Sequence, residues 1–593
     1  MSIRTPVSES DRDRLTATSG LAALALDAMA SVAYGPEAIV LVLALAGGTG
    51  IGFTLPVTLT IAALLALLVA SYRTLISAYP DGGGAYAVAK SRLGKRVSLV
   101  AAASLIIDYV LNVAVSIAAG VAALTSAFPG LLPWTPWVCL VVLALVLAVN
   151  LRGIAHSARV FIIPTVVFVG SILSVIVVGL FRDQPMVSPE GVTSATTVQT
   201  VGVLLLLKAF SSGCAALTGI EAIANAVPSF REPRVRRAQS AEVGLGVLLG
   251  TMLIGLAVLI EKFDIRPVEG VTVLSQLTSA TLGDGFLYFV VQFATVILLA
   301  LAANTSFGGL PTLMRLLAAD HYLPHRFAQR SAHDVYKWGV WTLSTAAAIL
   351  LIGAGGQMNT LVPLFAIGVF IGFTLAQIGL VLHWWAERPA GWRRRATLNA
   401  VGATATAVAA LVTLAMKFTD GAWLIVVLVA VLVPVMLRIR DSYEDIGEAR
   451  QLDHTPARPT RSSTVALIPV GGVDEVARRA VSAALSMDAD RTIAIHVCDS
   501  LEADATAKFV DAWEEWDPGV PLVLLNGSDG EISKPVADYI GRRHDRHQVF
   551  VIIGEVVTAN GWQQVLPNHR GDDLELELRS IPNVVICRQS LNA

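Results

Sequence analysis

The chain has 593 residues, of which 54% are hydrophobic and only 15% charged, and its formal net charge is -2. This composition, with a mean hydropathy of +0.66, excludes an ordinary soluble enzyme and indicates a polytopic membrane protein. The balanced charge gives no reason to expect a nucleic-acid partner.

Hydrophobic stretches long enough to cross a bilayer predict an α-helical polytopic membrane protein with twelve helices. The predicted spans are residues 21–45, 52–78, 97–124, 132–150, 158–181, 200–228, 241–260, 285–306, 338–354, 359–386, 397–417 and 421–438. Lys and Arg gather in alternate loops, which predicts that both termini are cytoplasmic in the cell membrane. The N-terminal stretch lacks the layout of a cleavable signal, so the first span is expected to remain in the bilayer.

The first span carries polar residues at bilayer depth. Burying a carboxylate there costs roughly 2.5–3.5 kcal/mol, so Asp27 is expected to be functional and to require a cation as its partner. Ser31 and Tyr34 follow it, and Gly35-Pro36 predicts a break in this helix, which is tolerated where the backbone is protein-buried or lines a wet cavity. The alternative is a plain kinked helix with a satisfied Asp27.

The sixth span predicts a second broken helix, because Ser-Ser-Gly and Thr-Gly sequences precede Glu221 in the middle of an apolar stretch. Thr218 adds a hydroxyl oxygen beside this carboxylate. Two interrupted helices five spans apart indicate an inverted-repeat secondary transporter whose site lies at the breaks.

The third span adds a further carboxylate. Asp108, Asn112 and Ser116 share one helical face, and Tyr109 lies beside them. Three intramembrane acids with hydroxyl, amide and phenol oxygens suit a hard monovalent cation, whose hydration shell such oxygens replace.

Each of these side chains also has a purely structural interpretation. Tyr34 and Tyr109 could be packing aromatics, and Ser31 and Ser116 could be small residues that let helices approach closely. Glu221 could only form a hydrogen bond to a neighbouring helix.

Four longer motifs resemble the amino acid-polyamine-organocation (APC) superfamily. They are SAYPDGGGAYAVAKSRLG at residues 77–94, NLRGIAHSARV at 150–160, TGIEAIANAVPSFREP at 218–233 and RLLAADHYLPHRF at 315–327. The resemblance implies a LeuT-like fold of five plus five inverted-repeat helices plus two, with substrate between helices one and six and usually proton coupling. Amino acid carriers of the superfamily generally have a Gly-x-Gly break in helix one, which residues 30–36 lack.

The sequence DAMASVAYGPE at residues 27–37 resembles the helix-one signature of KimA-type potassium-proton symporters, a branch of this superfamily. The resemblance implies potassium at Asp27, Tyr34, Tyr109, Ser116 and Thr218, with proton coupling at Glu221. Asn112 departs from the pattern, since a Thr is expected there, although an amide oxygen can still coordinate a cation.

Beyond the last span the composition changes. Residues 1–20 are expected to be a cytoplasmic segment, 21–440 the transporter domain, 441–463 a polar linker and 464–593 a cytoplasmic α/β domain with a parallel sheet. The element order resembles the universal-stress-protein-like domain of KimA-type transporters, which implies regulation, by cyclic di-AMP for example, and a homodimer. A scaffold domain that binds no ligand is the alternative. The Gly-x2-Gly-x9-Gly-Ser/Thr nucleotide motif of true universal stress proteins is not evident, and residues 554–569 stand in its place.

The function predicted from these features is potassium import coupled to protons, with no required cofactor and no enzymatic activity. A proton-coupled amino acid or polyamine permease of the same superfamily remains the alternative, and a non-transporting sensor is a third class. The four cysteines lie far apart, so neither disulfides nor a structural metal site are predicted.

Overall fold

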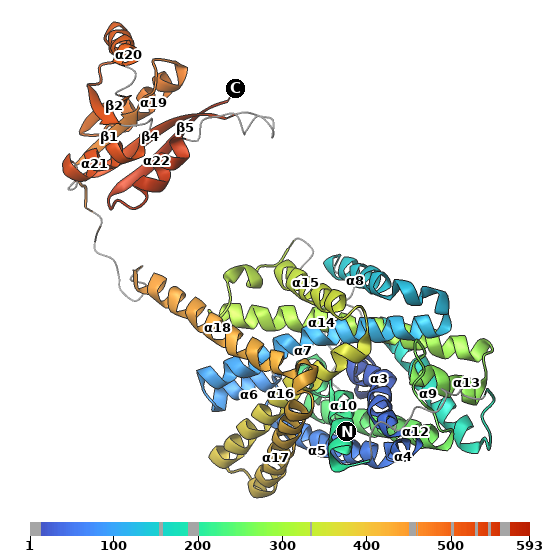
Figure 1. Ribbon diagram of the computed structural model, residues 1–593. Helices are drawn as coiled ribbons and strands as arrows, with labels where there is room; N and C mark the ends of the chain where they lie inside the picture. The colour runs from blue at the N-terminus through green and yellow to red at the C-terminus, as the bar shows by residue number, and fades with distance from the viewer. Residues whose placement is uncertain are drawn as a thin grey trace, which may run out of the picture. The chain divides into compact units, whose positions relative to one another are not determined.

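The computed structural model describes residues 14–82, 84–152, 158–187, 201–331, 335–449, 458, 460–499, 503–527, 532–543, 547–557 and 570–592. The chain divides into two units, Met1–Arg450 and Gln451–Ala593, and each is described by itself. Figure 1 shows the first unit as helices alone and the second as a sheet with helices on it.

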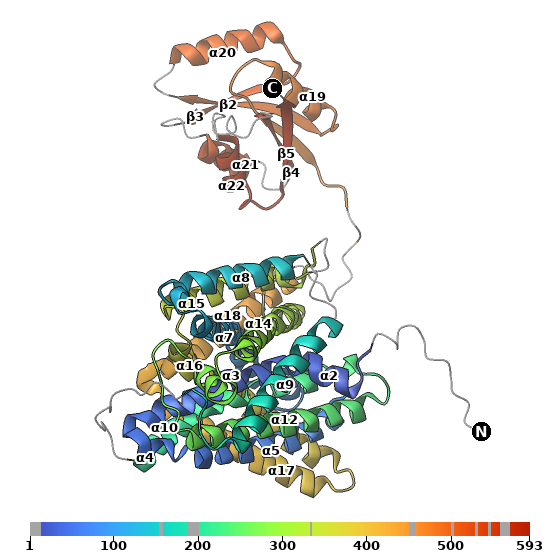
Figure 2. The ribbon, with the colours of Figure 1, turned by 90° about the vertical axis from the view of Figure 1, so that its right-hand side faces the viewer.

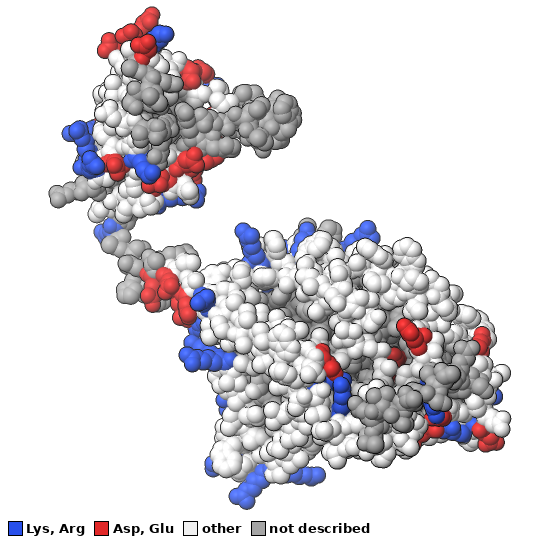
Figure 3. All heavy atoms as spheres, in the orientation of Figure 1, with Lys and Arg blue, Asp and Glu red and all other residues white. Residues whose placement is uncertain are grey.

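Eleven helices of the described residues are long and apolar enough to cross a membrane. These spans are Leu26–Ile51, Thr54–Ala78, Lys95–Ala127, Pro129–Leu151, Phe161–Phe181, Val203–Asn225, Arg234–Lys262, Phe286–Ala319, Met358–Glu387, Trp392–Met416 and Phe418–Glu448. The ninth predicted span corresponds to α15 (Lys337–Gly353), which is apolar but shorter, so the count of twelve stays a prediction. The face of this unit seen in Figure 3 is largely uncharged.

Helices α3 (Leu26–Leu43) and α10 (Val203–Gly213) lie in the middle of this unit and pack against each other. Around them are arranged α5 (Thr54–Ala78), α7 (Lys95–Ala127), α12 (Arg234–Lys262), α14 (Phe286–Ala319) and α16 (Met358–Glu387). All but one of the 18 residues of α3 are buried, as expected for a helix enclosed by others.

The remaining helices lie farther out or in connections. They are α2 (Ala17–Leu24), α4 (Gly47–Ile51), α6 (Gly84–Arg92), α8 (Thr135–Leu151), α9 (Ala158–Phe181), α11 (Glu221–Asn225), α13 (Val273–Leu282), α17 (Trp392–Met416) and α18 (Trp423–Ala449). The short helices α6 and α13 were not predicted from the sequence. The linker was predicted to begin at residue 441, whereas α18 continues nine residues further to Ala449.

The predicted break at Gly35-Pro36 is wrong, because α3 runs through both residues. The interruption of the first span lies at Ala25, between α2 and α3. Proline is tolerated inside membrane helices when surrounding groups satisfy the freed backbone, and Pro36 is buried. Gly35 instead permits a close approach, since a Cβ there would lie 2.8 Å from the Cβ of Ala216.

The predicted break in the sixth span is confirmed. After α10 the chain forms a tight turn, η4 (Cys214–Leu217), and Thr218 is then extended with φ -70° and ψ 154°. Gly219 has a φ of +79°, a conformation that glycine adopts without strain, and α11 begins at Glu221. The inverted repeat to which these two interruptions would belong stays a prediction.

The second unit contains a five-stranded parallel sheet in the order β3-β2-β1-β4-β5, so the predicted parallel α/β domain is confirmed. Its strands are β1 (Thr464–Pro469), β2 (Arg491–Asp499), β3 (Leu522–Gly527), β4 (Gln548–Val557) and β5 (Val584–Asn592). Its helices are α19 (Glu475–Leu485), α20 (Ala503–Trp516), α21 (Ser533–Arg543) and α22 (Arg570–Leu578).

Helices cover both faces of this sheet (Figure 2). Along β1, Ala466 and Ile468 face the cluster that α19 and α20 close, while Val465 and Leu467 face the cluster of α21 and α22. Helix α22 was not predicted from the sequence. Most of residues 554–569, where a nucleotide motif was sought, lie outside the described residues.

Candidate functional site

The centre of the candidate site is Asp27, in the first turn of α3 and two residues beyond the interruption at Ala25. Its side chain is buried, with a residue exposure of 9%, and its Oδ1 has no hydrogen-bond partner among the described residues. The break in the sixth span lies directly against it: a Cβ on Gly219 would be 2.9 Å from Asp27 Cγ and 2.6 Å from the backbone nitrogen of Ala28. Only glycine fits at this contact.

Two more carboxylates share this environment. Asp108 of α7 is 3% exposed and Glu221, the first residue of α11, is 9% exposed. Each of the three acids interacts electrostatically with the other two, and each has an oxygen without a hydrogen-bond partner in the described structure. None is paired with a Lys or Arg of the described residues. Such a buried group of acids is stabilised by protons or by a cation from outside the chain.

Neutral oxygens complete one side of the site. The Tyr34 hydroxyl lies 3.4 Å from the Thr218 Oγ1. This contact connects α3 to the extended residue of the break. The same Thr218 hydroxyl is 3.1 Å from the carbonyl oxygen of Ala215. A hydroxyl that donates its hydrogen keeps lone pairs with which it can coordinate a cation.

The third span contributes through a hydrogen-bond chain. Ser116 donates to the Asn112 amide oxygen over 3.0 Å, and Asn112 Nδ2 donates to Ser306 of α14 over 2.9 Å. Tyr109 is half-buried, interacts electrostatically with the three acids and packs against Gly309 of α14. The Asn112 oxygen is therefore engaged within the protein, whereas Tyr109 belongs to the surroundings of the acids.

Ser31 has a different position from the one expected of an ion ligand. Its hydroxyl is 2.7 Å from the Ala28 carbonyl oxygen and 2.9 Å from that of Ala216. Because Ala216 lies in the turn after α10, Ser31 connects the two interrupted spans at the site. This contact explains why a hydroxyl occurs there without requiring it to bind an ion.

The comparisons with known proteins identify the family of the chain. Residues 18–437 match the amino acid permease family, and residues 461–590 match the C-terminal domain of the KimA potassium transporter. The chain is 36% identical over 577 residues to the potassium transporter KimA of Bacillus subtilis, covering 95% of this chain and 94% of that protein. The chain belongs to the KimA family of APC transporters.

More distant similarities lie outside the KimA family. The low-affinity putrescine importer PlaP of Escherichia coli is 22% identical over 335 residues, which cover 54% of this chain and 72% of the importer. A manganese transporter from Eremococcus coleocola, solved with an aromatic bis-isothiourea compound, is 14% identical and gives a TM-score of 0.42, with 76% of this chain and 98% of that one covered.

Two buried residues close to these acids were not predicted from the sequence. Tyr72, which lies within the predicted second span 52–78, is 1% exposed and interacts electrostatically with Glu221, Asp108 and Glu242. Glu242 falls at the edge of the predicted span 241–260 and so looked like a boundary residue, but it is fully buried in α12. A hydropathy window averages such residues with their neighbours, so only their tertiary position reveals them.

Lys208, which could have neutralised one of the acids, lies elsewhere. Its Nζ is 3.4 Å from Asp420 Oδ2 in the segment before α18. The acids of the site therefore do not have this lysine as their partner.

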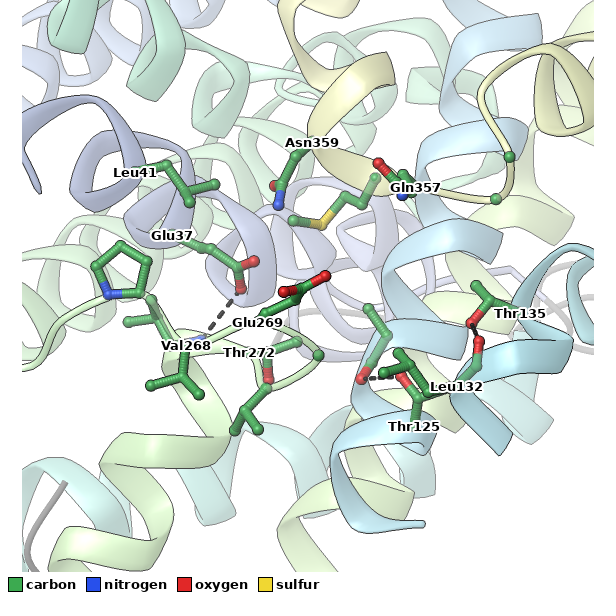
Figure 4. A pocket seen from close by; sticks show the side chains of 18 of the residues that line it. Glu37, Leu41, Thr125, Leu132, Thr135, Val268, Glu269, Thr272, Gln357 and Asn359 are labelled. Carbon is green, nitrogen blue, oxygen red and sulfur yellow. Dashed lines mark hydrogen bonds between the residues drawn. The ribbon is translucent and has the colours of Figure 1, made fainter. Parts of the chain in front are cut away.

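An open pocket of about 470 Å³ lies toward the far end of α3, where Glu37 is ten residues beyond Asp27 (Figure 4). Glu37 and Glu269 line it together with Thr125, Gln357 and Asn359. The Glu37 carboxylate accepts a hydrogen bond of 3.2 Å from the Val273 backbone nitrogen. Acidic and neutral oxygens around such a pocket make it attractive to cations.

Proposed function

We propose that this KimA family member imports potassium together with protons and binds the ion between α3 and the break after α10. The observation that carries the proposal is the contact of Gly219 with Asp27, which brings Glu221 and Thr218 from one interrupted span against Asp27 and Tyr34 from the other. Oxygen ligands of this kind suit a hard cation, and the relative from Bacillus subtilis is a potassium transporter.

The conformation of α3 supports a cation over an amino acid. Residues 30–36 are helical, so their backbone N–H groups are not arranged as a nest for a substrate carboxylate. Three unneutralised acids would in addition repel such a group.

Proton coupling is assigned to Glu221. It directly follows the extended break in the sixth span, where a change in the break would move it relative to Asp27. A carboxylate that alternates between proton and potassium as its counter-charge would link the two movements.

The surrounding parts have supporting roles in this proposal. The pocket around Glu37 and Glu269 is the outer vestibule that concentrates cations. Both termini are cytoplasmic in the plasma membrane, and the second unit mediates a homodimer and regulation by a nucleotide such as cyclic di-AMP.

Uptake by proteoliposomes tests the function. With an inward proton gradient, the purified protein should accumulate rubidium, used as a potassium tracer, and excess potassium should suppress the signal. Absence of gradient-driven rubidium uptake by a correctly inserted protein would contradict the proposal.

A polyamine is the second candidate, because the putrescine importer is a relative and a diamine could use the same carboxylates. Putrescine is therefore added as a competitor in the same assay. Labelled putrescine accumulating in place of rubidium would favour this second function.

A further inference from the structure

The fully buried residue Glu242 lies outside the ion site described above. It is on α12, its exposure is 0%, and neither Oε1 nor Oε2 has a hydrogen-bond partner among the described residues. A carboxyl group enclosed in this way is far more stable with a proton than as an unpaired anion.

The packing of α12 against α5 places Glu242 opposite a tyrosine. A Cβ on Gly250 would lie 3.7 Å from Leu65, and one on Gly246 would lie 2.6 Å from Val69. One turn farther along this antiparallel contact, Glu242 is level with Arg73, which is exposed, and with the neighbouring Tyr72, which is buried and interacts with Glu242. The Tyr72 ring packs edge-on against Phe373 with centroids 5.6 Å apart, so this side of the carboxyl is aromatic and apolar.

The buried charged groups that interact with Glu242 are acids, while Arg73 on the facing helix α5 is exposed. Glu242 interacts electrostatically with Glu221 of α11 and with Tyr72 of α5. Helix α3 also packs on α12 and carries Asp27 and Glu37, whereas α2, α13 and residues 161–181 of α9 carry no titratable side chain. No described Lys or Arg pairs with Glu242, so a proton is the counter-charge available from solution.

Glu242 lies near one end of α12. It lies eight residues from Arg234, or about 12 Å along the helix. That end carries Arg234, Arg236 and Arg237, which makes it the predicted cytoplasmic end. Glu242 therefore lies closer to that end of α12 than to Lys262 at the other end.

We propose that Glu242 is a second proton-binding carboxyl group, which receives the proton released by Glu221 and passes it toward the cytoplasmic end of α12. Glu242 first gives its own proton to water at the cytoplasmic end, and the carboxylate left behind then takes the proton from the Glu221 carboxyl, with Tyr72 beside both groups. This inference rests on the proposed proton coupling at Glu221 and adds the exit side of the proton path.

The test uses the full-length protein in proteoliposomes and the variants Glu242→Gln, Glu242→Asp and Glu261→Gln. Glu261 is the matched control, since it lies on the same helix but accepts a hydrogen bond of 2.7 Å from the Leu55 backbone nitrogen, which a glutamine oxygen can also accept. Glu242→Gln should lower gradient-driven rubidium uptake roughly tenfold or more, as expected when a proton-transfer group is lost. It should leave potassium–rubidium exchange without a gradient unchanged, while Glu242→Asp restores part of the driven uptake.

A purely structural role predicts a different pattern. In that case Glu242→Gln would reduce exchange and driven uptake together, or change neither, and Glu242→Asp would be no better than Glu242→Gln. Either result would overturn the proton-transfer role.

Infrared difference spectroscopy during a pH titration examines the proton itself, independently of the transported ion. The wild-type protein and Glu261→Gln should show the signal of a protonated buried carboxyl that Glu242→Gln lacks, and Glu221→Gln should retain it. An unchanged signal in Glu242→Gln would overturn the inference. If the wild-type protein shows this signal but transports no rubidium, the proposed potassium function fails while the proton on Glu242 stands.

Discussion

Both units of the protein gather three carboxylates in one place, but they compensate the charge differently. In the second unit, Arg588 contacts all three acids of its cluster: its guanidinium is 2.7 Å from Glu555 Oε2 and 2.6 Å from Asp572 Oδ1, and it also bonds Glu575. In the membrane unit, no described Lys or Arg pairs with Asp27, Asp108 or Glu221.

The different compensation of the acids reflects the different roles of the two clusters. The acids of the second unit lie at the surface and have a permanent cation, as suits a group that holds β5 and α22 together. The acids of the membrane unit are buried at greater cost, which a fixed arginine could have reduced. Leaving them without one keeps their counter-charge exchangeable, as transport requires.

The largest effect is expected from Asp27→Asn, which removes the charge and keeps the shape. Rubidium uptake by proteoliposomes should fall to background, because the amide no longer offsets the charge of a bound cation. Asp264→Asn is the control, since Asp264 is an exposed residue that pairs with Arg266 at 2.6 Å. Wild-type uptake by Asp27→Asn would remove the basis for the cation site.

Gly219→Ala should be nearly as harmful for a steric reason. Its Cβ would overlap Ala28 at 2.6 Å, in addition to the roughly 1 kcal/mol that a positive φ costs a non-glycine residue. Gly94→Ala is the matched control, because Gly94 also has a positive φ, +85°, but no atom within 4 Å of the added Cβ. We expect uptake to be lost in the first variant and retained in the second, and equal uptake would show that the contact with Asp27 is dispensable.

Glu221→Gln should have a more selective effect. The amide imitates a permanently protonated acid, so accumulation driven by a proton gradient should be lost while some potassium–rubidium exchange survives through Asp27, Tyr34 and Thr218. The measurement is uptake with and without the imposed gradient. If the variant still accumulates rubidium in response to the gradient, coupling resides elsewhere, and Asp108 is the next candidate.

Deletion of the second unit after Ala449 should change transport activity itself very little. The membrane helices satisfy their own backbone hydrogen bonds and should still insert. Cross-linking should show fewer dimers, and any response of uptake to cyclic di-AMP should disappear. An unchanged dimer fraction together with an unchanged nucleotide response would leave the second unit without its proposed role.

The smallest effect is expected from the Arg588 cluster. Hydrogen bonds from Arg588, and then from Arg579, lower the pKa of Glu575 below its ordinary value. A lowered folded-state pKa adds stability above the unfolded value of about 4.3, and this stability is lost as the pH falls through the folded pKa. Protection of the α22 amides against hydrogen exchange, expressed relative to the intrinsic exchange rate at each pH, should therefore decrease upon acidification in the full-length protein, and Arg588→Gln should remove most of that pH dependence. Identical profiles for both proteins would contradict the assignment.

The features that depend on local composition could be predicted from the sequence alone. Apolar length located the spans, and alternation of strands and helices located the parallel sheet. The high cost of burying a carboxylate identified Asp27, Asp108 and Glu221 as candidates, and Gly219 and its neighbours marked the break in the sixth span. Each of these signals is carried by a residue and its immediate neighbours in the chain.

Which of the local conformational preferences prevails depends on contacts in the tertiary structure. Gly35-Pro36 looked like a break, but packing against Ala216 keeps α3 helical there and the interruption moves to Ala25. The Leu-Glu-Leu-Glu-Leu sequence of α22 alternates as a strand would, yet burial of Leu574 and Leu578 selects a helix. Glu242 and Tyr72 lie close to the acids because α5 and α12 pack together. Contacts between distant segments outweigh local propensity because burial and packing contribute more free energy than a single residue's conformational preference.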